Sequence, residues 1–475
     1  MTFRAARAGQ IGELWLVTGS QHLYGPQALA AVAAHGEEVA RGLTAGLPVP
    51  VRHRGPVTTA EEIRRTCLEA TADDACAGVI VWAHTFSPAK AWIAGLEALG
   101  KPLLHLHTQF DRELPWAEID MDFMNLNQSA HGDRELAHAL TRLGVRRKTI
   151  AGHWRDPTVV TRIATWTRAA LGMREARSLT VARIGDNMRS VAVTEGDKVE
   201  AQRQLGFAVD GYGVGELTAA VEEAGGAQVD SLLTEYADTY ELAPDVRGSD
   251  ALREAARIEL GLRAFLDARG AHAFTDTFED LGALRQLPGI AVQRLMAEGY
   301  GFGAEGDWKT AALVRIAKVM AGDLAGGTSF MEDYTYDLTP GGEAVLGAHM
   351  LEVCPSIAAD RPSCEIHPLA IGGREDPVRL VFTAHPGEAV VASLVDLGDR
   401  FRFVVGEVEV IEPPAPLPKL PVARALWRPR PDFYSAAEGW LAAGGAHHTV
   451  LSFPLGVGVF DDLAAMAGIE LVAIR

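Results

Sequence analysis

The feature that most constrains the fold is an alternation between two hydrophobic periods over the first two-thirds of the chain. Short apolar runs such as "ELWLVTGS", "AGVIVWAH" and "KPLLHLHT" predict buried strands. Helical spacing follows each of them, as in "PQALAAVAAHGEEVARGL", "SPAKAWIAGLEALG" and "DRELAHALTRLGV". A second series opens at "SLTVARIGDN" and includes the long helical stretch "SDALREAARIELGLRAFLDARG". This order predicts an α/β protein with two successive parallel, doubly wound layers and a break near residue 175.

The pattern changes after about residue 325. The runs "SFMEDYTYDLT", "AVLGAHMLEVCPSI", "VRLVFTAH", "AVVASLVDLGD" and "FRFVVGEVEVI" have strand character, with Gly, Pro and Asp turns and few helices between them. Such spacing predicts an antiparallel barrel or sandwich. The run "EPPAPLPKLPV" is expected to cross its surface as a proline-rich connector.

Charge and cysteine content narrow the possible partners and the compartment. The chain has 44 Lys and Arg against 62 Asp and Glu, a formal charge of -18. That charge repels phosphate backbones and anionic lipid, so neither nucleic acid nor a membrane surface is an expected partner. No apolar run is long enough for a signal peptide or a membrane span. The four cysteines form no Cys-x-x-Cys pair and are expected as reduced thiols in a cytoplasmic protein.

The motif "GFGAEG", residues 301–306, matches the dinucleotide fingerprint Gly-x-Gly-x-x-Gly. That fingerprint binds pyrophosphate only where a strand leads into it. Here the helical pattern "IAVQRLMAEGY" leads in, so an NAD-dependent dehydrogenase is only the second alternative. The chain has no P-loop and no Gly-x-Ser-x-Gly elbow.

Carboxylates and imidazoles form a candidate metal set. Each has an ordinary structural role open to it: helix capping for Glu305, a surface ion pair on an edge strand for Glu332, and core packing for His349. In "GGAHHTV", residues 444–450, at most one of the two histidines can face a given site if the segment is a strand. Two carboxylates with two imidazoles suit Mn²⁺, Fe²⁺ or Co²⁺ better than a thiolate zinc site does, but the spacing alone does not show that they converge.

Several long segments resemble the L-arabinose isomerase family. They are "VTGSQHLYGPQ", "VWAHTFSPAKAWI", "HTQFDRELPWAEIDMDFMNLNQSAHGDRE", "GAEGDWKTA", "GGTSFMEDYTY", "GAHMLEVCPSIA", "LPKLPVARALW" and "GGAHHTV". The resemblance runs from about residue 13 to about residue 460. It implies two Rossmann-like domains, 1–175 and 176–325, followed by a C-terminal β-barrel domain, 326–475. It also implies conversion of L-arabinose to L-ribulose with Mn²⁺, and in many members of D-galactose to D-tagatose.

Carried over residue by residue, the family's metal ligands fall on Glu305, Glu332, His349 and His448, which leaves His447 pointing elsewhere. The two glutamates are then also the catalytic proton-transfer pair. One would move a proton from C2 to C1 of the open-chain sugar through a cis-enediol, while the other moves protons between the oxygens. A metal near O1 and O2 would stabilise the negative charge that develops.

The resemblance further implies sugar contacts and an assembly. The contacts are Gln21, Leu23, Tyr24, Phe86, Gln128, His131, Met188 and Phe278. The expected assembly is a homohexamer with active sites at subunit interfaces, where Gln128 and His131 would reach a metal held by the next chain.

One departure and two further alternatives remain. The chain stops at "IELVAIR", where family members usually continue, so the barrel domain is expected to be shortened at its end. Two Rossmann-like layers around a sugar also describe solute-binding proteins, although binding alone needs no metal and no paired carboxylates. An isomerase that prefers L-fucose or another aldose would differ only in the shape of its pocket.

Overall fold

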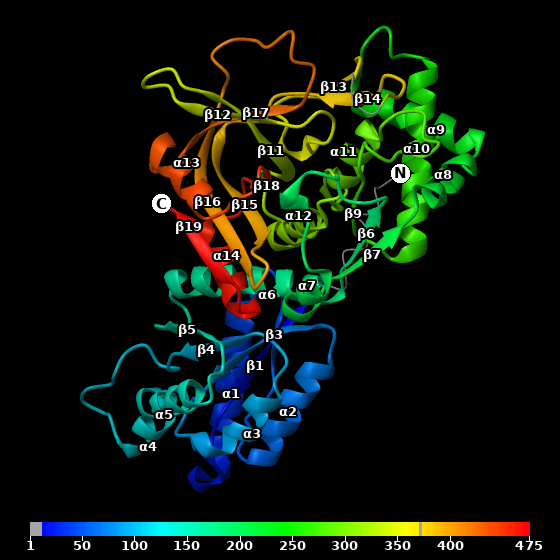
Figure 1. Ribbon diagram of the computed structural model, residues 1–475. Helices are drawn as coiled ribbons and strands as arrows, with labels where there is room; N and C mark the ends of the chain where they lie inside the picture. The colour runs from blue at the N-terminus through cyan, green and yellow to red at the C-terminus, as the bar shows by residue number, and fades with distance from the viewer. Residues whose placement is uncertain (1–11, 370–372) are drawn as a thin grey trace. The chain divides into compact units, whose positions relative to one another are not determined.

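The computed structural model describes residues 12–369 and 373–475, which form two compact units (Figure 1). We call residues 12–174 the N-terminal unit and residues 175–475 the C-terminal unit. Among the described helices, none combines the length and the apolar composition that a lipid bilayer requires of a spanning helix.

A parallel five-stranded sheet forms the centre of the N-terminal unit, with the strand order β2-β1-β3-β4-β5. The strands are β1 (Glu13–Thr18), β2 (Val51–His53), β3 (Cys76–Trp82), β4 (Leu103–His107) and β5 (Lys148–Ala151). The helices are α1 (Gly25–Thr44), α2 (Ala60–Ala72), α3 (Ile93–Ala98), α4 (Met121–Leu126), α5 (Ser129–Arg142) and α6 (Pro157–Ser178), which continues into the next unit. This order is that of a doubly wound sheet, so the carboxyl ends of β1 and β3 flank its switch point. The predicted parallel α/β layer is confirmed.

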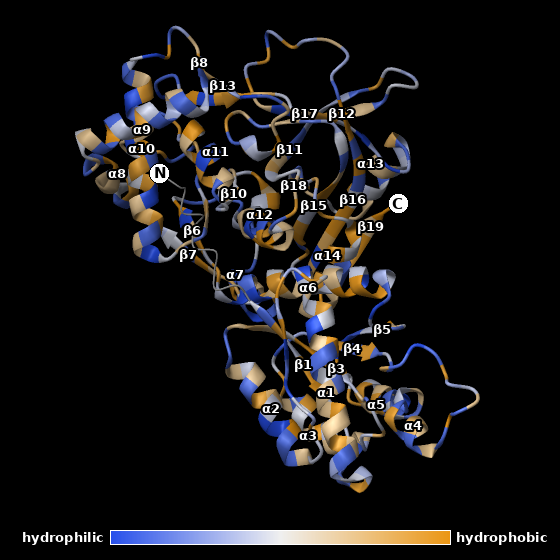
Figure 2. Cartoon of the chain, turned by 180° about the vertical axis from the view of Figure 1, so that it is seen from behind, coloured by the Kyte–Doolittle hydropathy of each residue, from blue (hydrophilic) through white to orange (hydrophobic). Residues whose placement is uncertain are grey.

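Local sequence explains these elements. All seven residues of β3 are buried, as expected of a strand covered on both faces by helices. Helix α2 begins with a capping box in which Thr59 and Glu62 satisfy each other's backbone amides. In Figure 2, β3 carries mainly hydrophobic residues, whereas α2 carries both kinds.

The C-terminal unit begins with a second parallel sheet, in the order β10-β9-β6-β7. Its strands are β6 (Thr180–Ile184), β7 (Ala208–Tyr212), β9 (Ala273–Thr275) and β10 (Gly301–Gly303). The helices are α7 (Lys198–Gln204), α8 (Val214–Glu222), α9 (Gly226–Thr239), α10 (Asp250–Arg269), α11 (Gly289–Ala297) and α12 (Trp308–Ala321). The second predicted parallel layer is therefore confirmed as well.

A closed barrel follows in the same unit. Six antiparallel strands run in the order β15-β18-β11-β12-β17-β16, and pairing of β15 with β16 closes the ring. The strands are β11 (Thr328–Asp337), β12 (Ala344–Ala348), β15 (Gly387–Asp396), β16 (Phe401–Ile411), β17 (Arg424–Pro429) and β18 (His448–Ser452). A small separate sheet contains β8 (Glu241–Leu242), β13 (Ser363–Ile366) and β14 (Val378–Val381). The choice between barrel and sandwich is thus settled in favour of the barrel, and the proline-rich run connects β16 to β17.

Three elements at the end of the chain were not anticipated. They are α13 (Phe433–Ala442), α14 (Val457–Ala467) and β19 (Glu470–Ile474). Strand β19 pairs with β16 in the parallel sense, which a purely antiparallel barrel does not contain. The connection through α14 supplies the crossover that a parallel pair needs.

Helix α12 lies between the parallel sheet and the barrel. It contacts β6, β9 and β10 on one side and β11, β15 and β18 on the other. Ten consecutive residues from its first position are buried, so this helix is surrounded by protein on all sides. Both sheets that supply the candidate site are therefore packed against one rigid element.

The glycines of "GFGAEG" have a packing role in this arrangement. The helical lead-in is confirmed as α11, but the motif itself begins with strand β10, which the sequence did not predict. A Cβ at Gly301 would lie 2.1 Å from the Ala311 carbonyl oxygen, and one at Gly303 would lie 2.3 Å from that of Asp307. The first two glycines thus lie within a strand that packs tightly on α12, whereas a dinucleotide fingerprint places them after the strand.

Candidate metal centre

Glu305 occupies the turn between β10 and α12. It is the one non-glycine residue with a positive φ, 62°, among those the structure describes. A non-glycine residue in the left-handed region costs about 1–3 kcal/mol and persists only where its surroundings fix it, often at functional sites. The capping role considered as an alternative for Glu305 belongs to another residue, because Asp307 is the N-cap of α12 and accepts from the Thr310 amide at 3.2 Å. The Glu305 carboxylate is therefore free for another function.

Glu332 and His448 are brought together by the register of two barrel strands. Glu332 on β11 lies directly opposite His448 on β18, and directly opposite Ala348 on β12. Residues opposite each other in an antiparallel pair project to the same face. Strand β11 lies between two partners, so the edge-strand role considered for Glu332 does not apply.

His349 directly follows Ala348, which is the last residue of β12 and the one that lies opposite Glu332. Its Nε2 is 3.8 Å from Oε2 of Glu332. Phe330 packs edge-on beneath both imidazoles, with ring centroids 5.1 Å from that of His349 and 5.2 Å from that of His448. The Phe330 ring therefore forms an apolar surface on one side of the polar cluster.

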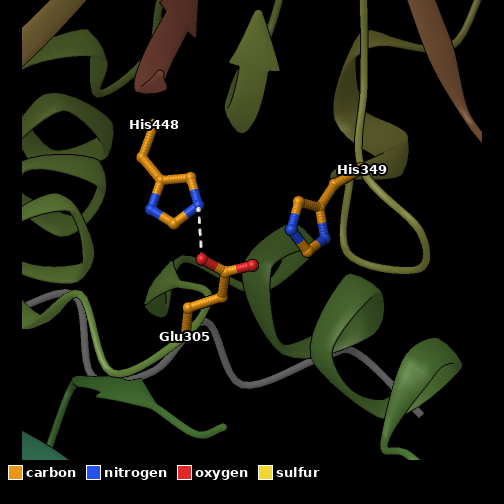
Figure 3. A group of neighbouring side chains, drawn as sticks. All are labelled: Glu305, His349 and His448. Carbon is orange, nitrogen blue, oxygen red and sulfur yellow. Dashed lines mark ion pairs between the residues drawn. The ribbon is translucent and has the colours of Figure 1, made fainter. Parts of the chain in front are cut away.

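Glu305, His349 and His448 converge on one point (Figure 3). One ligand atom from each lies within 4.8 Å of the others. Nε2 of His448 is 3.9 Å from Oε2 of Glu305 and has no hydrogen-bond partner among the described residues, although His448 is completely buried. A buried ring nitrogen aimed at two other donor groups is what a metal ligand requires, because an unpaired polar atom is otherwise costly.

Two further carboxylates orient the imidazoles from behind. Asp307 Oδ2 is 3.1 Å from Nδ1 of His448, and Glu352 Oε2 bonds Nδ1 of His349. Such carboxylate–histidine pairs fix the ring tautomer and leave Nε2 free to coordinate. Neither residue was predicted from the sequence, although each is close to a candidate ligand: Asp307 is two residues after Glu305 and Glu352 is three residues after His349.

The electrostatics of the cluster favour positive charge. Burial alone would lower the pKa of His349, but Glu352, Glu332 and Glu305 outweigh it and raise this pKa to about 9. Burial is the main reason that the pKa of Glu332 is raised. Burial would also raise the pKa of Asp307, yet Lys309 and His448 bring it well below the usual range. The same carboxylates that favour an imidazolium would favour a divalent cation in its place.

The spacing and the chemical types of these donors fit a divalent ion with oxygen and nitrogen ligands. Ligands on one transition metal, each at about 2.1 Å, are separated by at most ~4 Å, close to the spacing of this cluster. No cysteine belongs to the cluster, and all four cysteines are free and buried. Carboxylates and imidazoles without thiolates suit Mn²⁺, Fe²⁺ or Co²⁺.

His447, the first histidine of the pair, is not part of the cluster. Its backbone oxygen accepts from the Asp333 amide, and burial together with His448 lowers its pKa to about 4. The structure thus separates the two neighbours, with His448 in the cluster and His447 outside it.

Six of the predicted sugar contacts lie in the N-terminal unit, at the carboxyl-end loops of its sheet. Gln21, Leu23 and Tyr24 follow β1, Phe86 follows β3, and Gln128 and His131 are at the start of α5. Tyr24 Oη donates to Gln128 Oε1 at 2.7 Å, and the rings of Phe86 and His131 are 4.6 Å apart. Leu23 is 88% exposed. Ligands of open α/β sheets bind at this edge.

The two remaining predicted contacts lie in the C-terminal unit. Met188 follows β6, and its amide donates to the Glu305 carbonyl oxygen at 3.0 Å. Phe278 follows β9, the neighbour of β10 in the sheet. Both therefore belong to loops at the same sheet edge as Glu305, since parallel strands end on one side.

The chain matches known proteins over nearly its whole length. Family profiles of the L-arabinose isomerase N-terminal, central and C-terminal domains match residues 9–178, 180–323 and 327–470. An L-arabinose isomerase of Nocardioides sp. is 62% identical, over 97% of this chain and 93% of that protein. Those of Geobacillus stearothermophilus and Mycolicibacterium smegmatis are each 59% identical, over 98% and 97% of this chain and 94% and 93% of theirs.

These matches show the class of this protein: it is an enzyme, an isomerase that interconverts an aldose and a ketose. More particularly, the chain belongs to the L-arabinose isomerase family.

Proposed function

We propose that this enzyme converts L-arabinose to L-ribulose with Mn²⁺ at the Glu305–Glu332–His349–His448 centre, and that it also converts D-galactose to D-tagatose. The observation that carries the proposal is the convergence of Glu305, His349 and His448, with Glu332 at 3.8 Å from His349, in a member of this family. Co²⁺ or Fe²⁺ would be chemically acceptable substitutes.

When bound, the ion would supply Lewis-acid polarisation of the sugar carbonyl and stabilise the negative charge that develops on the oxygens. The chain itself must move two protons. One glutamate takes the proton from C2 and returns it to C1 through a cis-enediol. The other moves the hydroxyl proton from O2 to O1, so that atoms and charge balance between aldose and ketose.

Three observations support assigning this exchange to Glu332 and Glu305. Burial raises the pKa of Glu332 above its ordinary value, which makes this carboxylate a stronger proton acceptor. Glu305 is held in the cluster by its turn, whose carbonyl oxygen accepts from the Met188 amide. Asp307 and Glu352 keep the two imidazoles in the tautomer that leaves Nε2 free.

The sugar would be held by the residues carried over from the family. Gln21, Tyr24, Gln128 and His131 offer polar groups for hydroxyls, while the side chains of Leu23, Phe86, Met188 and Phe278 offer apolar walls. We propose a homohexamer in which Gln128 and His131 serve the metal site of a neighbouring chain. Light scattering with parallel assays tests this, and an active monomer would rule it out.

All four cysteines are free and buried, which fits a reducing cytoplasm as the location of the enzyme. Sensitivity of the folded protein to thiol-reducing agents would argue against that location.

The experiment that tests the function is ketose formation by metal-stripped protein, with and without Mn²⁺, from L-arabinose, D-galactose and L-fucose. We expect ketose from L-arabinose only with metal, and a lower rate from D-galactose. Ketose formation without metal would refute the proposed centre. No ketose from any sugar, in protein shown to be folded, would favour a sugar-binding protein instead.

A matched variant isolates the role of the carboxylate. Glu305→Gln keeps the size of the side chain but removes its charge and its basicity. We expect turnover to fall by a factor of roughly 10³ or more, since both a ligand and a proton carrier are lost. Near-normal turnover would rule out this role. Glu388→Gln, on the exposed side of barrel strand β15, is the control that should change nothing.

A further inference from the structure

The turn that carries Glu305 is held by a loop from another strand of the same sheet. Glu305 and Gly306 both have positive φ values, 62° and 81°. A Cβ at residue 306 would lie 2.5 Å from Cα of Asn187 and 2.8 Å from the Asp186 carbonyl oxygen, so only glycine fits. The loop between β6 and α7, residues 185–197, which we call the clamp loop, therefore lies directly against this turn.

Three hydrogen bonds fix the turn, two from the clamp loop and one from the segment after β9. In the clamp loop, the Met188 amide donates to the Glu305 carbonyl oxygen at 3.0 Å, and Asn187 Nδ2 donates to that of Gly306 at 3.1 Å. From the β9 side, the Asp276 carbonyl oxygen accepts from the Gly306 amide at 2.9 Å. The clamp loop is also attached to α12, because Lys309 Nζ donates to its Glu195 carbonyl oxygen at 2.6 Å.

Asn187 is the centre of this arrangement. Only 6% of the residue is exposed. Its Nδ2 donates to the carbonyl oxygens of Thr194 and Gly306, at 2.5 and 3.1 Å, and its Oδ1 accepts from Arg183 Nη1 at 2.7 Å. A primary amide is the side chain that can donate twice and accept at once in this space. One residue thus closes the clamp loop on itself and joins it to the Glu305 turn.

We propose that Asn187 is a positioning residue that holds the Glu305 carboxylate where a cation can bind it. The inference rests on the proposed function, because it takes Glu305 to be a metal ligand. A left-handed non-glycine residue relaxes toward ordinary φ values unless its neighbours prevent it. Loss of the Asn187 bonds would let the turn relax and the carboxylate move, and a metal site loses affinity when a ligand is displaced by about 1 Å.

Met188 connects the clamp loop with the proposed sugar pocket. Met188 is next to Asn187 and bonds Glu305 through its backbone. The same clamp loop would therefore place an apolar wall of the sugar pocket and a metal ligand together. Loosening the clamp loop should affect binding of both the cation and the sugar.

The test compares Asn187→Ala with Gln286→Ala as a matched control. Gln286 is another buried amide of the same unit, and it joins two backbone segments away from the centre: Nε2 donates to the Ala251 carbonyl oxygen at 2.8 Å, and Oε1 accepts from the Val378 amide at 3.0 Å. Both variants should lower the melting temperature of the metal-free enzyme. Only Asn187→Ala should weaken Mn²⁺ binding, by about tenfold, in a calorimetric titration.

Two further readouts separate positioning from a general loss of structure. In metal-free protein, the amides of Met188 and Gly306 should exchange hydrogen faster in Asn187→Ala than in Gln286→Ala. In kinetics, excess Mn²⁺ should restore a large part of kcat in Asn187→Ala, while KM for L-arabinose stays raised. Asn187→Ser, which keeps one donor, replaces the alanine variant if the latter does not fold.

Mn²⁺ affinity and amide exchange equal to those of the wild type in the folded Asn187 variant would overturn the proposal. Failure of the proposed function has a different signature: Mn²⁺ would then bind wild type and Glu305→Gln equally, while the exchange difference in metal-free protein would persist.

Discussion

Acid should destabilise the N-terminal unit through His84, a buried imidazole. His84 follows β3 and is completely buried. Its Nε2 is 2.8 Å from Nδ1 of His35, and its own Nδ1 has no partner among the described residues. The ring stacks between Trp82, at 4.3 Å, and His35, at 5.0 Å. Burial, reinforced by His35, lowers the pKa of His84 from 6.5 to about 3.

The direction and size of the effect follow from linkage. The unfolded chain binds a proton at His84 below pH 6.5, while the folded chain does not until about pH 3. The contribution of neutral His84 to the unfolding free energy is therefore fully present above pH 6.5 and is lost as the pH falls toward 3. Each unit of pH costs about 1.4 kcal/mol, so the loss at about pH 5 is about 2 kcal/mol.

Other histidines of the N-terminal unit also change how the unfolding free energy depends on pH. Burial also lowers the pKa values of His35 and His53, so both add to the loss of stability in acid. A hydrogen bond to Asp133 raises the pKa of His107 instead. His107 therefore stabilises the fold below its unfolded pKa, and this contribution is lost as the pH rises through its folded value. A substitution at His84 is needed to isolate its own share.

The assay is urea unfolding of the full chain at about pH 7.5 and about pH 5, followed by hydrogen exchange of peptides from β3. In His84→Gln, which keeps an acceptor for His35, the loss of unfolding free energy between the two pH values should be smaller by about 2 kcal/mol. His138→Gln, at an exposed site on α5, should lose as much as the wild type. An equal loss in His84→Gln and wild type would show that His84 does not remain neutral in the fold.

Three other changes have defined outcomes. Glu259→Gln should lower the unfolding free energy by about 3–5 kcal/mol in urea titrations, because it removes the fully buried carboxylate that Arg294 and Arg263 share, although Arg294 keeps its ion pair with Glu235; a loss below 1 kcal/mol would contradict this. Mn²⁺ binding near neutral pH should release about one proton from His349, whose pKa is raised to about 9, and the affinity should fall as the pH falls; calorimetry in two buffers of different ionisation enthalpy measures this, and no release would refute it. Gly347→Ala should lower the unfolding free energy by about 1–3 kcal/mol, because its Cβ would lie 2.1 Å from the Trp427 ring; an unchanged urea midpoint would show that the barrel absorbs the clash.

The alternating periods were enough to predict the two parallel layers, because strands buried on both faces differ in composition from the helices that cover them. Strand β3 and helix α10 are examples, with a continuous apolar run in the first and an amphipathic period in the second. Strand β10 could not be found this way. It has three residues, two of them glycines, and its sequence reflects the close approach of α12 rather than β propensity. The parallel pairing of β19 was missed because one strand's own sequence contains no information on the direction of its partner.

The candidate site required the family resemblance, because its residues converge only through long-range pairing. The register that sets Glu332 opposite His448 joins strands that are far apart in the sequence. The capping role considered as an alternative for Glu305 follows from a local rule, and in this structure Asp307 has that role. Rules that use only neighbouring residues thus indicated what each residue type can do. They did not show which of the two carboxylates caps the helix and which belongs to the metal cluster.

The origin of the four proposed donors explains why their geometry depends on packing beyond the site itself. Glu305 comes from the edge of a parallel sheet, whereas the other three come from the barrel. Helix α12 begins two residues after Gly306 and packs against strands of both sheets. Its buried residues include small ones such as Ala311 and Ala312, which allow close approach on opposite sides. Because a close-packed helix transmits displacement rather than absorbing it, a change of side-chain volume in α12 should alter the spacing between Glu305 and the proposed ligands on the barrel even where both sheets remain folded.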